Sequence, residues 1–189
     1  MDLLLFGIQG SGKGTQAKKL STEFSYDIFE AGGELRKIAA SGSDLGQTVK
    51  SYIDQGKLVP HEIIMQVVKE AIAARAKDQK ILFDGIPRDG NQQKDFDAIM
   101  KDAGREFRVI HLLLDRDEGM KRIFGRAKAE GRADDANEEI ITRRMNTFFE
   151  KTMPVLEDYK RRGLVTEMDG KRGVKEVYGE MKKAIGGQD

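Results

Sequence analysis

The stretch GIQGSGKGT at residues 7–15 decides the fold, because it satisfies the pattern G-x-x-x-x-G-K. An apolar run at residues 2–7 precedes it, and a helical pattern at residues 13–24 follows. A glycine-rich loop between a strand and a helix can point its backbone N–H groups at a polyphosphate, and the helix adds its positive end. Lys13 would reach the outer phosphates. The alternative, a plain glycine-rich turn with an exposed lysine, fits this junction less well.

Apolar runs and helical patterns alternate along the rest of the chain, which predicts an α/β domain of the phosphate-loop NTPase type. Five strands are expected, at residues 2–7, 27–29, 80–84, 107–114 and 164–168. Helices are expected at residues 13–24, 33–40, 45–55, 61–76, 91–102, 117–130, 137–161 and 174–185. The near-continuous apolarity of LLLFGI, ILFDG and VIHLLLD predicts central strands of a parallel sheet covered by helices on both faces.

Composition limits the function classes. The chain has 189 residues, with 33 Lys and Arg against 32 Asp and Glu, so its formal net charge is +1. This balance lacks the basic excess of a dedicated nucleic-acid or anionic-membrane binder. The absence of Cys excludes disulfides and thiolate metal sites, and we expect no zinc. The opening apolar run has no basic segment before it, so we expect neither a signal peptide nor a membrane span, and a cytoplasmic protein.

Charged side chains at the carboxyl ends of the strands predict a phosphate site. Asp84 ends the third expected strand, where it could orient water bound to Mg²⁺ or simply cap a turn. Gly14 stands where most such loops carry the Ser or Thr that ligates magnesium, and Thr15 comes one residue later. Arginines suited to bind phosphate oxygens occur at Arg36, Arg88, Arg122, Arg126, Arg132, Arg143 and Arg144.

Six sequence blocks carry a resemblance to a known family. They are GIQGSGKGTQ, AGGELR, GKLVP, FDGIPRDGNQQ, GRADD and the DG at residues 169–170. In this order and spacing the chain resembles a nucleoside monophosphate kinase, specifically an adenylate kinase of the short-lid type. The resemblance implies a core domain at residues 1–30, 61–126 and 137–189, a small helical monophosphate-binding insertion at 31–60 and a short lid loop at 127–136. It also implies a monomer that transfers a phosphoryl group reversibly from Mg-ATP to AMP.

The resemblance also implies which residues bind each nucleotide. The ATP site would comprise Gly10, Ser11, Gly12, Lys13, Gly14, Thr15, Arg122, Arg126 and Lys171. The AMP site would comprise Ala31, Gly32, Arg36, Lys57, Leu58, Val59, Gly85, Arg88, Gln92, Arg132 and Arg144. Catalytic roles at the transferring phosphoryl group would belong to Lys13, Arg88, Arg122, Arg132 and Arg144. Asp134 and Asp135 would order the lid by pairing with arginines.

Two departures from the family pattern concern the acceptor. Adenylate kinases usually have Thr-Gly-Asp where this chain has Ala-Gly-Gly at residues 31–33, and uridylate-cytidylate kinases carry Ala-Gly there. Those kinases, however, usually replace the equivalent of Gln92 with Asn, and a Gln amide can donate to and accept from an adenine edge. We therefore expect AMP as the acceptor, with a UMP/CMP kinase or a relaxed specificity as the alternative. Asp89, where Thr is frequent, could partly neutralise Arg88 or cap the next helix.

Other readings and residues carry less weight. A nucleotide-binding regulatory switch would be expected to show an N-K-x-D motif, which the chain lacks, and an inactive binding module would not need the full set of phosphate-facing positions. His61 and His111 are expected to be structural. Phe148, Phe149 and Tyr159 are expected to pack inward from the long helix.

Overall fold

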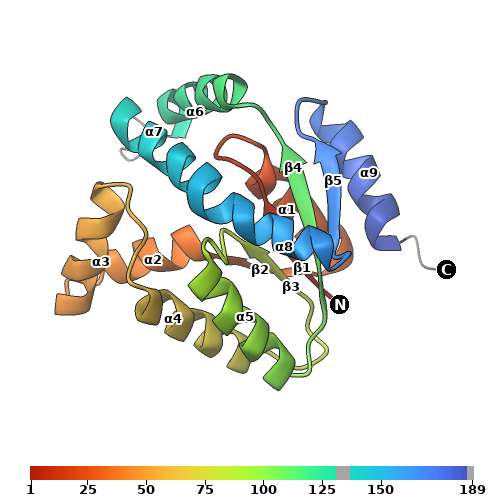
Figure 1. Ribbon diagram of the computed structural model, residues 1–189, viewed down its shortest axis with the longest axis horizontal. Coiled ribbons are helices and arrows are strands. Elements are labelled where there is room, and N and C mark those ends of the chain that lie inside the picture. Colours follow the sequence, from red (N-terminus) through yellow and green to blue (C-terminus); the bar gives the residue numbers. More distant parts are fainter. Residues whose placement is uncertain (131–136, 187–189) are drawn as a thin grey trace.

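The chain is organised around a parallel sheet (Figure 1). A computed structural model describes residues 1–130 and 137–186, and for residues 126–130 the backbone alone. The strands are β1 (Asp2–Phe6), β2 (Asp27–Glu30), β3 (Ile81–Asp84), β4 (Phe107–Leu113) and β5 (Val165–Asp169). They pair in the order β2-β3-β1-β4-β5, which confirms the expected five-stranded parallel sheet. Because β1 is central, the loop that follows it leaves from the middle of the sheet.

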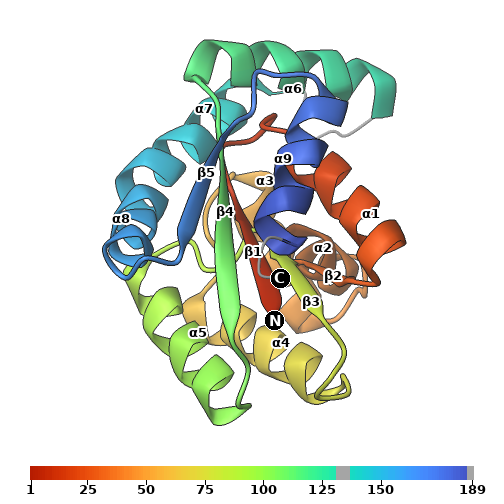
Figure 2. The ribbon, with the colours of Figure 1, turned by 90° about the vertical axis from the view of Figure 1, so that its right-hand side faces the viewer.

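Helices cover both faces of the sheet, as the apolar strands require. The helices α1 (Lys13–Phe24) and α9 (Val174–Gly186) lie on one face, as Figure 2 shows. The other face carries α4 (His61–Ala73), α5 (Gly90–Asp102), α7 (Glu138–Thr147) and α8 (Met153–Arg161). The helix α6 (Arg116–Glu130) follows β4 at the carboxyl end of the sheet.

The side chains of β1 show how the two cores form. Leu3 and Leu5 pack with the residues of α1 and α9, whereas Leu4 and Phe6 pack with those of α4, α5 and α8. Each of these four side chains is at most 3% exposed. Consecutive strand residues point to opposite faces, so a strand that is covered on both sides must be apolar throughout.

Two helices between β2 and α4 stand away from the sheet. They are α2 (Ala31–Ala39) and α3 (Asp44–Asp54), and Figure 1 shows them projecting beyond the edge of the sheet. The helix α2 begins directly after β2, two residues earlier than the sequence predicted. Ser43 caps α3, and its Oγ accepts a hydrogen bond of 3.0 Å from the N–H of Gly46.

The helix predicted at residues 137–161 is interrupted. A π-helical turn, η2 (Phe148–Thr152), separates α7 from α8. Pro154 lies in the first turn of α8 and has no N–H to donate to a preceding carbonyl, so the α-helical pattern cannot run through this point. The inward packing expected of Phe148 and Tyr159 is confirmed, but Phe149 is 44% exposed, so that expectation was wrong.

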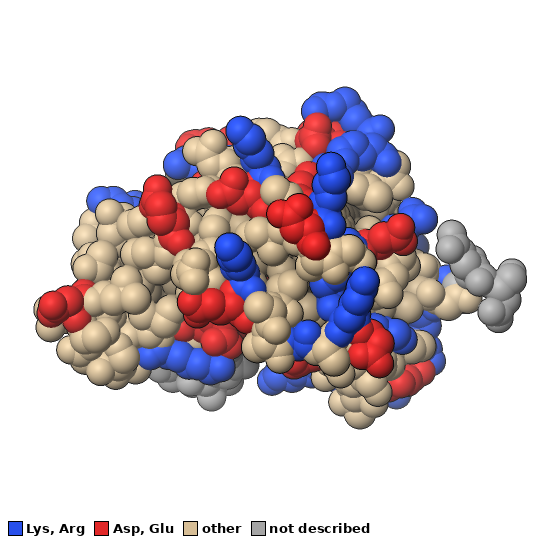
Figure 3. Space-filling view, turned by 90° about the horizontal axis from the view of Figure 1, so that it is seen from below, with Lys and Arg blue, Asp and Glu red and all other residues tan. Residues whose placement is uncertain are grey.

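The surface carries both signs of charge. Acidic and basic side chains are interspersed over the face shown in Figure 3, in keeping with the net charge of +1. Within residues 1–130 and 137–186, no helix is both long enough and apolar enough to cross a membrane.

Candidate active site

A cavity of about 450 Å³ lies at the carboxyl ends of the central strands. It is bounded by the loop after β1, by the helices α2 and α3, and by the long helix that contains η2. The residues predicted for a nucleotide site that line it are Gly10, Gly12, Lys13, Gly14, Thr15, Ala31, Gly32, Arg36, Lys57, Leu58, Val59, Asp84, Gly85, Arg88, Gln92, Arg122 and Arg144. Segments far apart in the sequence thus meet at one site.

The remaining predicted residues lie elsewhere or cannot be placed. Ser11 is buried beneath the loop, and Lys171 lies in a neighbouring depression with Arg122. The backbone of Arg126 belongs to α6, but its side chain is outside the described residues, as are Arg132, Asp134 and Asp135. The helix α6 continues through residue 130, so of the expected lid loop only residues 131–136 lie outside the described part.

The loop after β1 is held close to its neighbours by glycines. Gly10 has a φ of 83°, and a Cβ at this position would lie 2.7 Å from the carbonyl oxygen of Gly119 in α6. Only glycine fits this close approach. Lys13, the first residue of α1, donates from its Nζ to the carbonyl oxygens of Gly7 at 2.8 Å and Ile8 at 3.1 Å. Its ammonium group therefore lies folded across the loop.

Arg88 is fixed on three sides. Its Nε donates to the carbonyl oxygen of Gly85 at 2.7 Å, and its backbone N–H donates to the side-chain oxygen of Gln92 at 2.8 Å. Its own carbonyl oxygen accepts a hydrogen bond of 2.8 Å from Thr152. Gly85 has a φ of 84°, and a Cβ there would lie 2.8 Å from the Arg88 guanidinium. A side chain at position 85 would therefore displace this arginine.

Three arginines gather on the same side of the cavity. The pKa of Arg88 lies below its ordinary value, chiefly because the guanidinium is desolvated and also because Arg144 and Arg36 are near. The carboxylates of Asp84 and Glu30 act in the opposite direction. An arginine in a protein nevertheless keeps its charge, so this corner of the cavity is suited to bind a multiply charged anion.

Arg122 connects α6 with the loop after β5. Its Nε donates to Glu118 at 2.7 Å, and its Nη1 donates to the carbonyl oxygen of Gly170 at 2.8 Å. The N–H of Gly170 in turn donates to the carbonyl oxygen of Leu113, at the end of β4, at 2.8 Å. Lys171 forms an ion pair of 2.6 Å with Asp115. These contacts tie Arg122 to the carboxyl ends of β4 and β5.

Comparison with known proteins identifies the family. A family model described as adenylate kinase matches residues 5–164. This chain belongs to the adenylate kinase family. Three relatives named adenylate kinase are similar over nearly their full lengths. The enzyme of Thermus thermophilus is 35% identical over 185 residues, which cover 97% of this chain and 96% of that protein. The relative from Hyphomonas neptunium is 35% identical over 188 residues, which cover 98% of this chain and 98% of that protein. The relative from a Nocardioides species is 37% identical over 186 residues, which cover 98% of this chain and 97% of that protein.

Membership of the adenylate kinase family bears on the two readings of the acceptor. The relatives are named adenylate kinases, so the uridylate-cytidylate alternative is not favoured. Of the two roles considered for Asp89, capping is confirmed: its Oδ1 accepts a hydrogen bond of 2.9 Å from the N–H of Gln92, at the start of α5. That bond also sets where Gln92 enters the cavity.

Asp84 is the residue predicted to act on a divalent metal through water. Asp84, at the end of β3, is paired in register with Leu5 of β1, the strand that leads into the phosphate loop. Among the described residues, no group of three or more His, Cys, Asp or Glu side chains could hold a metal ion. Mg²⁺ typically keeps several waters and is bound through one or two carboxylates and substrate phosphates. Asp84 at the cavity wall fits that mode of binding.

Several cavity residues were not predicted. Thr147, Phe148 and Thr152 come from the end of α7 and from η2, and Glu30 ends β2. No motif marks the first three, because their approach to the cavity depends on the π-helical turn. Glu30 directly precedes the AGGELR block, so its place beside the site could have been suspected from the sequence.

Proposed function

We propose that this protein catalyses the reversible transfer of a phosphoryl group from Mg-ATP to AMP, which gives two ADP. The observation that carries the proposal is a single cavity lined both by a phosphate loop and by four arginines, Arg36, Arg88, Arg122 and Arg144. A nucleotide-binding switch would need a site for one nucleotide only. Phosphoryl transfer between two nucleotides needs positive charge at the donor, at the acceptor and on the moving group.

The donor would bind at the loop and beside α6. Backbone N–H groups of residues 10–15 and the Nζ of Lys13 would bind the ATP phosphates, with Ser11 supporting the loop from beneath. Lys13 would then exchange its bonds to the carbonyl oxygens of Gly7 and Ile8 for bonds to phosphate. Arg122 would contact the transferring group, and Arg126 and Lys171 would complete the donor side.

The acceptor would bind between the insertion and β3. Arg36 and Arg88 would bind its phosphate as planar forks, and Arg144 would approach from α7. Gln92 accepts the N–H of Arg88, which leaves one lone pair of its oxygen and its NH₂ group for an adenine edge. The walls around the nucleoside would be the backbone and side chains of Ala31, Gly32, Lys57, Leu58, Val59 and Gly85.

The reaction would be a direct in-line transfer. The attacking oxygen belongs to the AMP phosphate, which is already ionised, so no general base is required. Lys13, Arg88, Arg122, Arg132 and Arg144 would hold the two nucleotides in line and neutralise the charge of the transition state. Mg²⁺, when bound with ATP, supplies further charge neutralisation between the phosphates, and Asp84 would orient its water ligands.

Two segments would close over the nucleotides and exclude water. The insertion at residues 31–60 would close over AMP. The lid at 127–136 would bring Arg132, Asp134 and Asp135 to the phosphates. The remaining residues, 1–30, 61–126 and 137–189, would act as the core. We further propose a cytoplasmic monomer with ATP and AMP as its partners, without zinc and without nucleic-acid or membrane binding.

A panel of acceptors tests the function. Product formation would be measured with Mg-ATP and each of AMP, CMP, UMP and GMP, together with a control that lacks an acceptor. We expect ADP to form rapidly only in the reaction in which AMP is the acceptor. A preference for CMP or UMP would support the uridylate-cytidylate alternative. Hydrolysis of ATP that does not depend on any acceptor would overturn the kinase proposal.

A further inference from the structure

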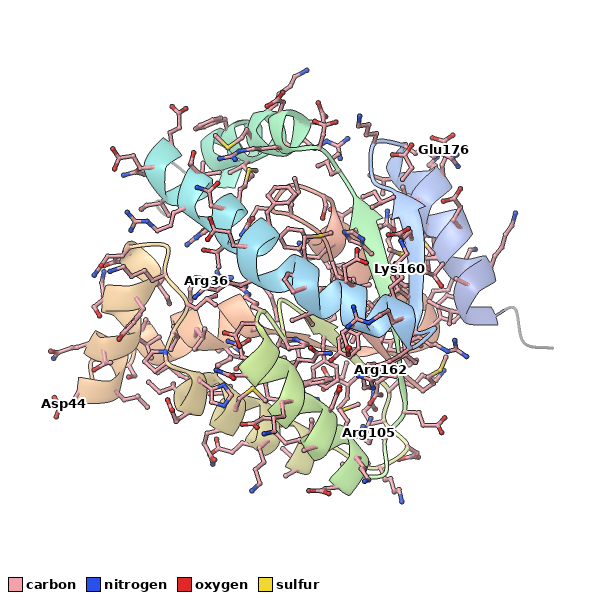
Figure 4. The ribbon with its side chains drawn as sticks, in the orientation of Figure 1. Arg36, Asp44, Arg105, Lys160, Arg162 and Glu176 are labelled. Atoms are coloured by element: carbon pink, nitrogen blue, oxygen red, sulfur yellow. The ribbon has the colours of Figure 1, made fainter. Side chains whose placement is uncertain are left out.

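Glu30 and Arg36 form an ion pair inside the cavity. The Oε1 of Glu30 lies 2.8 Å from the Nη2 of Arg36, and both side chains line the cavity wall. Glu30 is the last residue of β2, and Arg36 belongs to α2, whose side facing the long helix carries Arg36 in Figure 4. The pair is half-exposed, at 48% for Glu30 and 42% for Arg36. An anionic side chain therefore already contacts one of the arginines proposed to bind the acceptor phosphate.

The two glycines of α2 make room for this pair. A Cβ at Gly32 would lie 3.1 Å from the Nη1 of Arg36, and a Cβ at Gly33 would lie 3.3 Å from the Oε2 of Glu30. Both distances are tighter than ordinary van der Waals contact. The carboxylate and the guanidinium thus lie over bare backbone at the start of α2. A side chain at position 33 would compete with the Glu30 carboxylate for the same space.

The charges around the pair are unequal. Arg144 and Arg36 lie close enough to Arg88 to lower its pKa, and Asp84 and Glu30 raise it. Glu30 and Asp84 are paired in register at the ends of β2 and β3, so the two carboxylates lie side by side at this edge. A nucleoside monophosphate carries close to two negative charges at neutral pH. It would bind more strongly to three arginines opposed by one carboxylate than to three opposed by two.

We propose that Glu30 sets the affinity of the acceptor site: its carboxylate occupies Arg36 when the site is empty, and the acceptor phosphate must displace it. This inference rests on the proposed function of the cavity. An exposed ion pair is weak, so a nucleotide that also contacts Arg88 and Gln92 displaces Glu30 at small cost. Inorganic phosphate would have to displace the same carboxylate from Arg36, so Glu30 lowers its affinity in the same way as that of the nucleotide.

Glu30 has no second structural role that would obscure a test. It is the residue before the first turn of α2, but its side chain makes no capping hydrogen bond there. Neutralising it therefore removes no hydrogen bond from the helix start. The same helix supplies a matched control: Glu34 pairs with Lys37 at 2.8 Å, and neither of these residues lines the cavity.

The test compares Glu30→Gln with Glu34→Gln. We expect Glu30→Gln to lower the KM for AMP, and the Kd for AMP measured by calorimetry, by about two- to five-fold. The inhibition constant of inorganic phosphate against AMP should fall as well, whereas the KM for ATP should not change. Glu34→Gln should leave all four constants unchanged. Glu30→Ala should shift AMP binding in the same direction.

A thermodynamic cycle decides whether Glu30 acts through Arg36. In an Arg36→Ala background, Glu30→Gln should change AMP binding much less than it does in the wild-type protein. An unchanged or higher Kd for AMP in Glu30→Gln would overturn the inference, because a carboxylate that only orients Arg36 predicts weaker binding upon its removal. Wild-type protein that makes no ADP from AMP would instead indicate that the proposed function itself is wrong.

Discussion

Thr152 donates a hydrogen bond from its Oγ1 to the carbonyl oxygen of Arg88, at 2.8 Å and across 64 residues of sequence. Thr152 is 5% exposed and ends the π-helical turn η2. The backbone N–H of Arg88 donates a second hydrogen bond, to the side-chain oxygen of Gln92. One hydrogen bond therefore connects the long helix to the loop that presents Arg88, the arginine proposed to bind the acceptor phosphate.

Replacing Thr152 with Val should remove this hydrogen bond and preserve the packing of the side chain. Val has nearly the same shape, but it leaves the carbonyl oxygen of Arg88 without this part-buried hydrogen bond, which costs about 1 kcal/mol of unfolding free energy. We also expect the KM for AMP to rise while the KM for ATP stays constant. Denaturant unfolding and steady-state kinetics measure the two effects. Thr152→Ser keeps the hydroxyl and should retain both values. Equal stability of the Val variant and the wild type would show that the bond contributes nothing.

The sequence predicted the sheet and the phosphate loop because both depend on local patterns. The run LLLFGI followed by GSGK specifies a buried strand, a glycine turn and a helix start within about a dozen residues. Arg36, Arg88 and Gln92 were found from blocks whose spacing the family shares. The structure brings these three residues to one cavity, although their role in binding AMP and the catalytic role of Arg88 stay predictions.

The contacts that Thr152 and Glu30 make could not be predicted in this way. The approach of Thr152 to Arg88 depends on where the long helix widens, and apolar periodicity alone predicts an unbroken helix with Phe149 facing inward. The contact of Glu30 with Arg36 depends on the space left over Gly33. Such features follow from packing in three dimensions, which a single sequence does not state.

Lys13 should affect the rate of the chemical step more than any residue of the acceptor site. Lys13→Ala removes an ammonium group from the phosphate loop, and we expect kcat for ADP formation to fall by about two to five decades. Lys19, on the same helix, lies with its Nζ 5.3 Å from the ring centre of Tyr178 and serves as a matched control. Lys19→Ala should leave kcat nearly unchanged. Full activity of the Lys13 variant would contradict its assignment to the ATP phosphates.

Arg143 holds the insertion against the long helix. Its Nη1 donates to the carbonyl oxygen of Gln55 at 2.6 Å, and a Cβ at the adjacent Gly56 would lie 3.0 Å from Ile140. We expect Arg143→Ala to raise the KM for AMP a few-fold, on the scale of one exposed hydrogen bond to a charged donor, with little change in the KM for ATP. Lys151→Ala, at an exposed position further along the helix, is the control. A matching rise in both Michaelis constants would argue against a contact specific to the acceptor side.

The buried ion pair of Arg105 should contribute more to stability than an exposed one. It pairs with Asp2 at 2.7 Å, with side-chain exposures of 6% and 3%, and Figure 4 places it at the end of the molecule away from the cavity. Arg105→Met would leave the Asp2 carboxylate buried without its counterion, at a cost of about 3–5 kcal/mol in unfolding free energy. Arg161→Met removes an exposed pair with Asp158 and should cost less than about 1 kcal/mol. Similar losses in the two variants, measured by denaturant unfolding, would refute the role of burial.

His111 should make the folded protein sensitive to mild acid. It is 6% exposed within β4, and its pKa lies below the ordinary value, chiefly because burial disfavours the charged imidazole, although Glu167 at 3.6 Å opposes this. The unfolded chain therefore binds a proton at a higher pH than the folded protein does. The stabilisation by neutral His111 is complete above about pH 6.5, the ordinary value for histidine, and declines as the pH falls through its lowered folded-state pKa.

His111→Leu removes this titration and tests its sign. We expect the unfolding free energy of the wild type to fall more between pH 8 and pH 5.5 than that of the variant, because only the wild type has an imidazole that takes up a proton more readily in the unfolded chain than in the folded protein. At pH 8, where His111 is neutral in both states, the difference in unfolding free energy between the two proteins gives the cost of the substitution itself. This difference is subtracted from the difference measured at each lower pH. Equal losses of stability in the two proteins over this pH range would show that His111 does not determine the acid sensitivity.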